Sequence, residues 1–206
     1  MRIYTSGIIA YETAAKLYEE NKAQIEARFP KFFLQEFEKL PSDEAFESNF
    51  LAKLCIEKNT KKPYSKKNYY FDGAVYAREI LEGGIFAALW AACEDLKELL
   101  ETHKSFGCNV YLDQIPLNQH VVEILELLKE NPYEVSSKGS YLIIPLDDVT
   151  NESPQAESEC AQEVRLSEIG EITASNDRVI IWDENRRFLT PPLRQAKDMK
   201  DRRGEN

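Results

Sequence analysis

The sequence predicts an α+β fold, in which helices cover a mixed β-sheet, and three features of the chain support this class. Residues 11–56 contain helical segments that follow one another without an intervening strand. From residue 69 onward, short segments rich in β-branched and aromatic residues alternate with amphipathic helical segments. Residues 141–146 form a nearly continuous apolar run, which is typical of a strand covered on both faces of its sheet.

The N-terminal part begins with a short apolar segment and continues as helix. The pattern of residues 2–10 leaves open whether they are a strand or the end of another element. Residues 11–29 carry apolar side chains on one helical face and charged side chains on the other, which predicts an amphipathic helix. Pro30 ends that helix and suits the first turn of the next one, over residues 31–40, and Ser42 is a predicted N-cap for a third.

A polar, lysine-rich connection at residues 57–68 is the clearest break in the chain. We therefore predict an N-terminal helical segment with a basic loop over residues 1–68. An α+β domain is predicted over residues 69–193. The charged tail at residues 194–206 is predicted to be disordered.

Strands and helices alternate in this second domain, and turn residues and caps set their limits. The predicted strands are 69–80 (with Gly73 as a bulge), 109–113, 141–146, 178–183 and 187–189, the last two joined as a hairpin. The predicted helices are 83–103 and 118–130, the second capped by Asn118. Residues 136–140 and Gly170 are predicted turns, and helix and loop both stay open for residues 147–162.

Composition and charge argue against several classes of function. The 206 residues carry a formal net charge of −10, whereas a general nucleic-acid binder needs a basic surface. No apolar run approaches the roughly 20 residues of a membrane helix, and no secretory signal is visible. The 4 cysteines form no CxxC pair and only 2 histidines accompany them, so no metal site is predicted. Reduced cysteines in the cytoplasm are the simplest interpretation.

The stretch Glu82-Gly83-Gly84 is the leading candidate for a binding site, because it joins a predicted strand to a strongly apolar helix. Glycine leaves no Cβ at the start of the helix, so another backbone or a phosphate can approach closely. The free N–H groups and the positive end of the helix dipole favour an anion there. The alternative is that the glycine pair only lets a buried helix pack tightly against its strand.

Further candidates lie near this corner in the predicted fold. Glu79 and Glu82 have the chemistry to bind a metal or act as acid and base, although glutamates at a strand end are more often solvated or paired with lysine. Ser137, Gly139 and Ser140 form either a second anion-binding turn or a plain turn before a buried strand. The two histidines, His103 and His120, supply no catalytic dyad.

Five ordered blocks of the second half resemble a known family. They are residues 82–90 (EGGIFAALW), 110–118, 130–134 (ENPYE), 136–145 (SSKGSYLIIP) and 169–192. These blocks resemble the C-terminal domain of the aminoimidazole ribonucleotide synthetase-related proteins, a superfamily that includes selenophosphate synthetase, thiamine-phosphate kinase and a hydrogenase maturation factor. The N-terminal helices are similar to the helical linker between the two halves of such proteins.

The resemblance implies an α+β domain that in the full family packs against an N-terminal ATP-binding domain. In the family, that domain supplies the segments that hold ATP and magnesium. Residues 2–71 contain neither the paired aspartates nor the glycine-rich turns of such a site. We therefore expect ATP and Mg only if a partner chain brings the nucleotide domain, and predict no cofactor otherwise.

Departures from the family pattern weaken the expectation of catalysis. The family usually has an aspartate, then isoleucine or valine, then threonine before its double glycine, and this chain has Glu79, Ile80 and Leu81. Leu81 lacks the hydroxyl that could bond a phosphate, and Glu79 places its carboxylate one methylene further out. The hydrogenase factor ends in a reactive cysteine, which this C-terminus lacks. No catalytic residue is predicted.

These observations predict a stand-alone C-terminal domain that acts as a non-catalytic ligand- or partner-binding module. The alternative is one half of a split ATP-dependent enzyme, of phosphoryl-transfer or ligase type, that a separate ATP-binding chain completes. The expected partners are a second copy of the chain, that separate chain, or a small phosphorylated ligand. Neither nucleic acid nor a membrane is expected.

Overall fold

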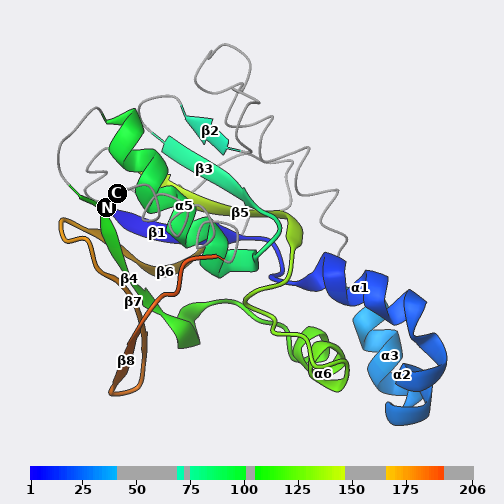
Figure 1. Cartoon of the computed structure of the whole chain (residues 1–206). Coiled ribbons are helices and arrows are strands. Elements are labelled where there is room, and N and C mark those ends of the chain that lie inside the picture. The colour runs from blue at the N-terminus through cyan, green and yellow to red at the C-terminus, as the bar shows by residue number, and fades with distance from the viewer. Residues whose placement is uncertain (41–68, 72–74, 101–104, 147–165, 193–206) are drawn as a thin grey trace, which may run out of the picture.

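A computed structural model describes residues 1–40, 69–71, 75–100, 105–146 and 166–192, with the backbone alone for 69–71. Its described strands form one 8-stranded sheet in the order β2-β3-β5-β1-β6-β4-β7-β8 (Figure 1). The predicted α+β class is therefore confirmed. The third helix expected after Ser42, the basic loop, residues 147–162 and the C-terminal tail lie outside the described residues.

The strands are short, and most of them pair with antiparallel neighbours. They are β1 (Arg2–Ser6), β2 (Tyr69–Phe71), β3 (Val75–Ile80), β4 (Gly107–Tyr111), β5 (Ser137–Pro145), β6 (Leu166–Thr173), β7 (Arg178–Trp182) and β8 (Asn185–Phe188). Only β4 and β7 pair in parallel among them. The predicted hairpin near the C-terminus is confirmed as β7–β8.

The described helices are α1 (Tyr11–Glu20), α2 (Lys22–Arg28), α3 (Lys31–Glu38), α5 (Gly84–Leu99) and α6 (Gln119–Leu127), with a 3-10 turn at η1 (Leu112–Gln114). The predicted N-cap of α6 is confirmed, since the Asn118 side chain accepts a hydrogen bond from the His120 backbone N–H at 2.9 Å. None of these helices combines the length and the apolar character that crossing a membrane requires.

The first segment of the chain supplies a central strand, which decides between the two alternatives for residues 2–10. Tyr4 of β1 pairs with Ile143 of β5 on one side, and Ile3 pairs with Gly170 of β6 on the other. Backbone hydrogen bonds along both edges of β1 thus hold the two halves of the sheet together. The division of the chain at residue 68 stays a prediction. Strand β1 precedes residue 68, but it pairs with β5 and β6, which follow it.

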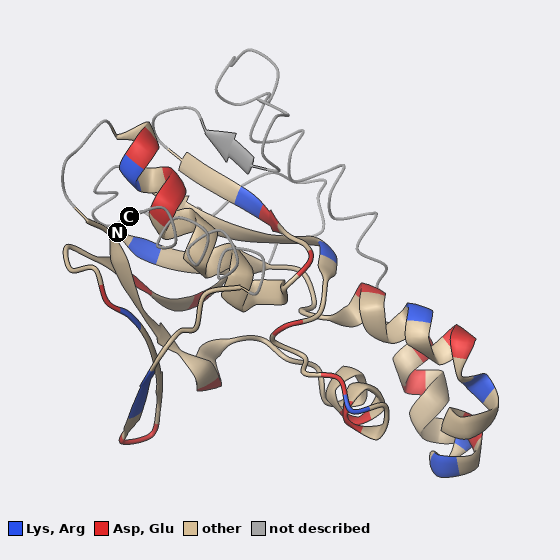
Figure 2. Cartoon of the chain, in the orientation of Figure 1, with Lys and Arg blue, Asp and Glu red and all other residues tan. Residues whose placement is uncertain are grey.

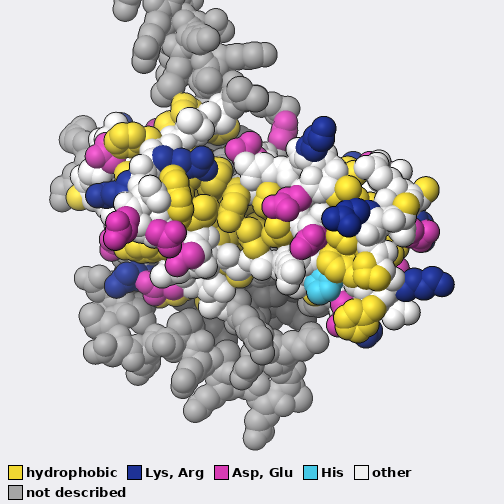
Figure 3. Space-filling view, turned by 90° about the horizontal axis from the view of Figure 1, so that it is seen from below, with side chains coloured by type: hydrophobic (Ala, Val, Ile, Leu, Met, Phe, Trp, Pro, Cys, Tyr) yellow, Lys and Arg dark blue, Asp and Glu magenta, His cyan; other side chains and the backbone are white. Residues whose placement is uncertain are grey.

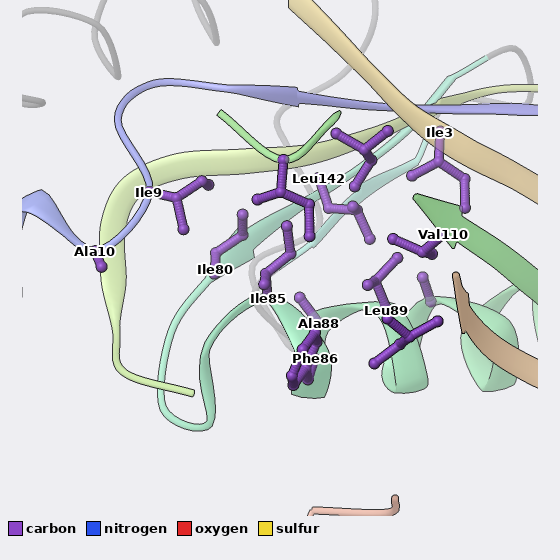
Figure 4. Close-up of a cluster of buried hydrophobic side chains, with 14 of the residues drawn as sticks. Ile3, Ile9, Ala10, Ile80, Ile85, Phe86, Ala88, Leu89, Val110 and Leu142 are labelled. Carbon is purple, nitrogen blue, oxygen red and sulfur yellow. The ribbon is translucent and has the colours of Figure 1, made fainter. Parts of the chain in front are cut away.

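Helix α5 lies across one face of the sheet (Figure 1). Leu89 of α5, Val110 of β4 and Leu142 of β5 point into the same interior (Figure 4), and each is at most 1% exposed. Burying one such side chain contributes roughly 1.5–3 kcal/mol. The charged residues of α5 gather in its C-terminal half (Figure 2), so its N-terminal half is almost wholly apolar.

A second helical group, α1, α2, α3 and α6, lies beside one end of the sheet (Figure 1). Ile25 and Phe37 are among its buried side chains, at 0% and 2% exposure. Aromatic rings join the helices, with Phe33 of α3 4.5 Å from the His120 ring at the start of α6. This contact gives His120 a packing role.

Four sequence predictions are wrong in detail. The helix predicted over residues 11–29 is two helices, α1 and α2, because Asn21 between them has a non-helical backbone (φ −120°, ψ 26°). Residues 69–80 are not one strand, because β2 turns back and Tyr69 pairs antiparallel with Arg78; Gly73 lies outside the described residues. The turn predicted at 136–140 is mostly strand, since β5 begins at Ser137. Gly170 is inside β6, where a Cβ would lie 2.1 Å from the Asn109 carbonyl oxygen. That glycine permits close strand packing and forms no turn.

Candidate functional site

The turn between β3 and α5 depends on both of its glycines. Gly83 has φ +84° and Gly84 has φ +64°, in the left-handed region that other residues enter only with strain. A Cβ on Gly84 would lie 2.4 Å from the Tyr133 carbonyl oxygen, and one on Gly83 would lie 2.7 Å from the Ala87 Cβ. Both the conformation and the surrounding atoms therefore require glycine here.

The group that approaches the start of α5 is the chain's own backbone. The Phe86 N–H donates to the Tyr133 carbonyl oxygen at 3.4 Å, and the two aromatic rings stack with centroids 5.3 Å apart. The carbonyl oxygen satisfies an N–H group that the first turn of a helix leaves without an internal partner. The sequence allowed either a backbone or a phosphate to approach Gly84. In the structure, the backbone of Tyr133 and Glu134 occupies that space.

The first residues of β5 lie beside the end of β3, as the sequence prediction required. Ile80 pairs with Ser137 in the sheet, and the Gly139 N–H donates to the Glu79 carboxylate at 3.2 Å. Glu82, exposed to solvent, lies two residues beyond the end of β3. The two groups of predicted site residues are thus brought to one edge of the sheet.

Both serines of this group are fully buried and bond to the loop between β1 and α1. The Ser137 hydroxyl accepts the Ala10 N–H at 2.7 Å, and the Ser140 hydroxyl donates to the Ile8 carbonyl oxygen at 3.4 Å. Ala10 has φ +67°, which costs a non-glycine residue about 1–2 kcal/mol. The bond from Ala10 to Ser137 stabilises this backbone, so Ser137 has a structural role that the sequence did not reveal.

We use the name glycine corner for this junction, which comprises Glu79, residues 82–84, Tyr133–Glu134 and residues 137–140. The amide donors in and around it, such as those of Gly84, Phe86 and Gly139, already bind acceptors within the chain. The charged side chains that it exposes are Glu82, Glu134 and Lys138. The geometry is that of a packed joint between three segments, and anion binding there stays a prediction.

Metal binding has no group of ligands to support it in the described part of the chain. No three His, Cys, Asp or Glu side chains lie together there in a way that could hold an ion. The ring Nδ1 of His120 lies 3.3 Å from the Asn118 side-chain oxygen, next to the helix cap. His103 lies outside the described residues.

Two polar clusters within the core were not found from the sequence. In the first, the Asp95 carboxylate of α5 accepts bonds from the Tyr76 hydroxyl at 2.8 Å and from Arg78 of β3. Burial, and then the negative charge of Asp95, raise the pKa of Tyr76 well above its ordinary value. The sequence feature that could have revealed this cluster is Asp95, a carboxylate on the helical face that Ala92 and Leu96 share.

The second cluster surrounds Arg178 of β7, whose side chain is only 7% exposed. Its guanidinium lies 3.9 Å from the Trp90 ring centroid and bonds to the Glu94 carboxylate, both on α5. The pairs Tyr76–Asp95 and Arg178–Glu94 attach α5 to strands that are far apart in the sheet. No sequence pattern marked Arg178, because arginine at the start of a strand is ordinarily solvated.

Comparisons with known proteins find similarity in structure alone. No protein-family model matches the chain, and no curated protein sequence matches it. The hydrogenase maturation protein HypE, solved in complex with ATP, matches 93% of this chain with a TM-score of 0.56. The chain shares the fold of HypE. The E. coli HypE structure gives the same TM-score, and HypE in the HypE-HypF complex gives 0.53.

The match is distant in sequence and covers part of the HypE chains. Identity is 14% for the ATP complex and for E. coli HypE, and 16% for the HypE-HypF complex. The chain spans about half the length of these proteins, 50% to 52%. The chain therefore shares its fold with about half of HypE, and membership of the aminoimidazole ribonucleotide synthetase-related superfamily stays a prediction. Correspondence to the C-terminal half in particular stays a prediction.

Proposed function

We propose that this chain is a partner-binding module with the fold of the C-terminal half of the synthetase-related proteins, and that it does not catalyse a reaction alone. The observation that carries the proposal is the coverage: 93% of this chain corresponds to only 50% of HypE. A fold that occupies half of a larger protein ordinarily has a surface that the other half covers.

The glycine corner supports a binding role over a catalytic one. The Gly139 N–H of the corner binds Glu79, and the N–H of the neighbouring Phe86 binds Tyr133, so neither donor is free to stabilise a reacting anion. Lys138 is the exposed cation of the corner. We propose the corner as a weak site for a small phosphorylated ligand, with Lys138 as its main electrostatic attraction.

The surface also supports a protein partner. Figure 3 shows hydrophobic side chains gathered across the centre of one face, with acidic and basic groups around them. Phe32 and Phe188 are 71% and 70% exposed. Contiguous apolar patches such as the one in Figure 3 mark interaction surfaces in many proteins. HypE has been solved in complex with HypF, so a protein of this fold binds another protein.

The test combines self-association and ligand binding by the purified chain. Sedimentation velocity would measure self-association, and calorimetric titration would measure binding of ATP with magnesium and of inorganic phosphate. We expect no ATP hydrolysis and either a dimer or capture of a specific protein partner. A monomer that hydrolyses ATP with magnesium unaided would refute the proposal.

A second candidate function is one half of a split ATP-dependent enzyme. It is favoured by the HypE structure solved with ATP, of which this chain spans half the length. We propose a separate cytoplasmic chain with the ATP-binding domain as its partner. A pull-down repeated with and without ATP distinguishes the candidates, because ATP-dependent capture of such a chain supports the split enzyme and ATP-independent capture supports the module.

A further inference from the structure

Arg178 leaves a polar group without a partner in the interior. Its side chain is more than nine-tenths buried, with one arm bonded to Glu94 and its plane over Trp90. The Nε atom has no hydrogen-bond partner among the described residues. A buried N–H donor without an acceptor is costly, by about 1–3 kcal/mol in mutational studies. An additional acceptor in this position would remove that cost.

Two cysteines flank the same guanidinium. Cys108 of β4 is the direct sheet partner of Arg178, and Cys93 lies on α5 between Trp90 and Glu94, which both contact Arg178. Both cysteines are unbridged, 1% exposed and part of one core cluster. Cys93 and Cys108 thus lie on the helix and the strand that meet at Arg178, in one core cluster beside a buried positive charge.

We propose that Cys93 and Cys108 form an oxidisable dithiol, with Cys93 as the attacking thiolate, Cys108 as the resolving thiol and a small hydroperoxide as the oxidant. Arg178 is the positioning residue, because its charge and its free Nε–H stabilise the thiolate. This site is separate from the glycine corner and does not depend on the proposed function.

The electrostatics of the cluster assign the two roles. A hydrogen bond from Cys108 and then the charge and a hydrogen bond of Arg178 lower the pKa of Cys93, against burial and the charge of Glu94, which raise it. The bond to Cys93 and burial raise the pKa of Cys108. Cys93 therefore ionises first, and the thiolate is the nucleophilic form of cysteine.

The reaction balances with hydrogen peroxide as the probe. The Cys93 thiolate attacks one peroxide oxygen, the O–O bond breaks, and Cys93 sulfenic acid and hydroxide form. The Cys108 sulfur then attacks the Cys93 sulfur and displaces its hydroxyl group, which takes the Cys108 proton and leaves as water. The proton that Cys93 released on ionising neutralises the hydroxide from the first step. Two thiols and one peroxide become one disulfide and two waters, so the thiols lose two electrons and the peroxide gains them.

The surroundings favour a small oxidant. Both sulfur atoms lie within the core, so a bulky disulfide such as oxidised glutathione has no direct approach. The Glu94 carboxylate, which bonds to Arg178 in the same cluster, is 52% exposed, so water and small solutes reach the outer end of the cluster.

The experiment uses the full chain with Cys55→Ser and Cys160→Ser, which leaves only the two core thiols. Hydrogen peroxide should convert it to a form about 2 Da lighter that dithiothreitol restores. With Cys108→Ser added, the sulfenic-acid reagent dimedone should label Cys93. With Cys93→Ser added, neither the mass loss nor the labelling should occur. Circular dichroism confirms that each variant is folded.

Two Arg178 variants separate positioning from packing. Arg178→Met removes the charge and should raise the midpoint pH of Cys93 alkylation and slow it at neutral pH by about tenfold or more, since one pKa unit is a factor of ten. Arg178→Lys keeps the charge and should restore most of the rate. Labelling of Cys108 in place of Cys93, or a folded two-cysteine protein that gains oxygen without forming the disulfide, would overturn the proposal.

Discussion

Replacing Gly84 by alanine should destabilise the protein more than any other single methyl addition at the glycine corner. The new Cβ would lie 2.4 Å from the Tyr133 carbonyl oxygen and 2.7 Å from the Glu134 carbonyl carbon. Alanine at φ +64° costs about 1–2 kcal/mol. Moving a packed backbone aside costs typically 1–3 kcal/mol. We therefore expect a loss of about 2–5 kcal/mol in the free energy of unfolding.

Urea unfolding followed by circular dichroism measures this loss. The matched control is Lys129→Gly, because Lys129 has φ +62° and already bears the strain that the new alanine would acquire. Glycine there should leave stability unchanged or raise it by up to about 1 kcal/mol. If Gly84→Ala cost less than about 0.5 kcal/mol, residues 133–134 would not cover the start of α5 in solution, and our account of the corner would be wrong.

Three further predictions concern other buried groups. Ser137→Ala should cost about 1–3 kcal/mol in urea unfolding, because the Ala10 N–H loses its acceptor; an unchanged midpoint would contradict this. Ala10→Gly should stabilise by up to about 1 kcal/mol by relieving φ +67°, and a loss of stability would show that the strain is absent. Tyr76 has a raised pKa, so its contribution to stability is full below about pH 10 and declines as the unfolded tyrosine ionises above that pH. Tyr76→Phe should therefore show a shallower fall in melting temperature above pH 10 than the parent, and equal slopes would refute the burial of that hydroxyl.

The core cysteines and the glycine corner have different consequences for function. The corner lies at an edge of the sheet and exposes charged side chains to solvent, which suits contact with a ligand or partner. Cys93 and Cys108 lie between α5 and the sheet, so a bond between them would link those two layers covalently. Oxidation would then restrict the motion of α5 without altering the residues of the corner itself.

Local signals in the sequence predicted several elements well. Asn118 caps α6 as expected because a side-chain oxygen followed by free backbone N–H groups is a local arrangement. The apolar run that begins at Tyr141 is the buried part of β5, since it must be covered on both faces. Gly83 and Gly84 form the strand-to-helix turn, as expected, because adjacent glycines permit the positive φ values that this turn has.

Long-range pairing decided the rest. Residues 2–6 gave no sign of a central strand, because that position depends on β5 and β6, which follow more than 130 residues later. Gly170, predicted as a turn, lies instead within β6, where its backbone packs closely against Asn109 of β4. No local pattern encodes this contact.

The sequence alone determined the class of fold and several of the places where the backbone turns, because periodicity, caps and glycines act over a few residues. Only the tertiary structure decided what fills the space beside Gly84, why Ser137 is buried, and that Arg178 lies beside two thiols. Those relations join residues distant in the chain, and burial removes the water that would otherwise have satisfied their polar groups.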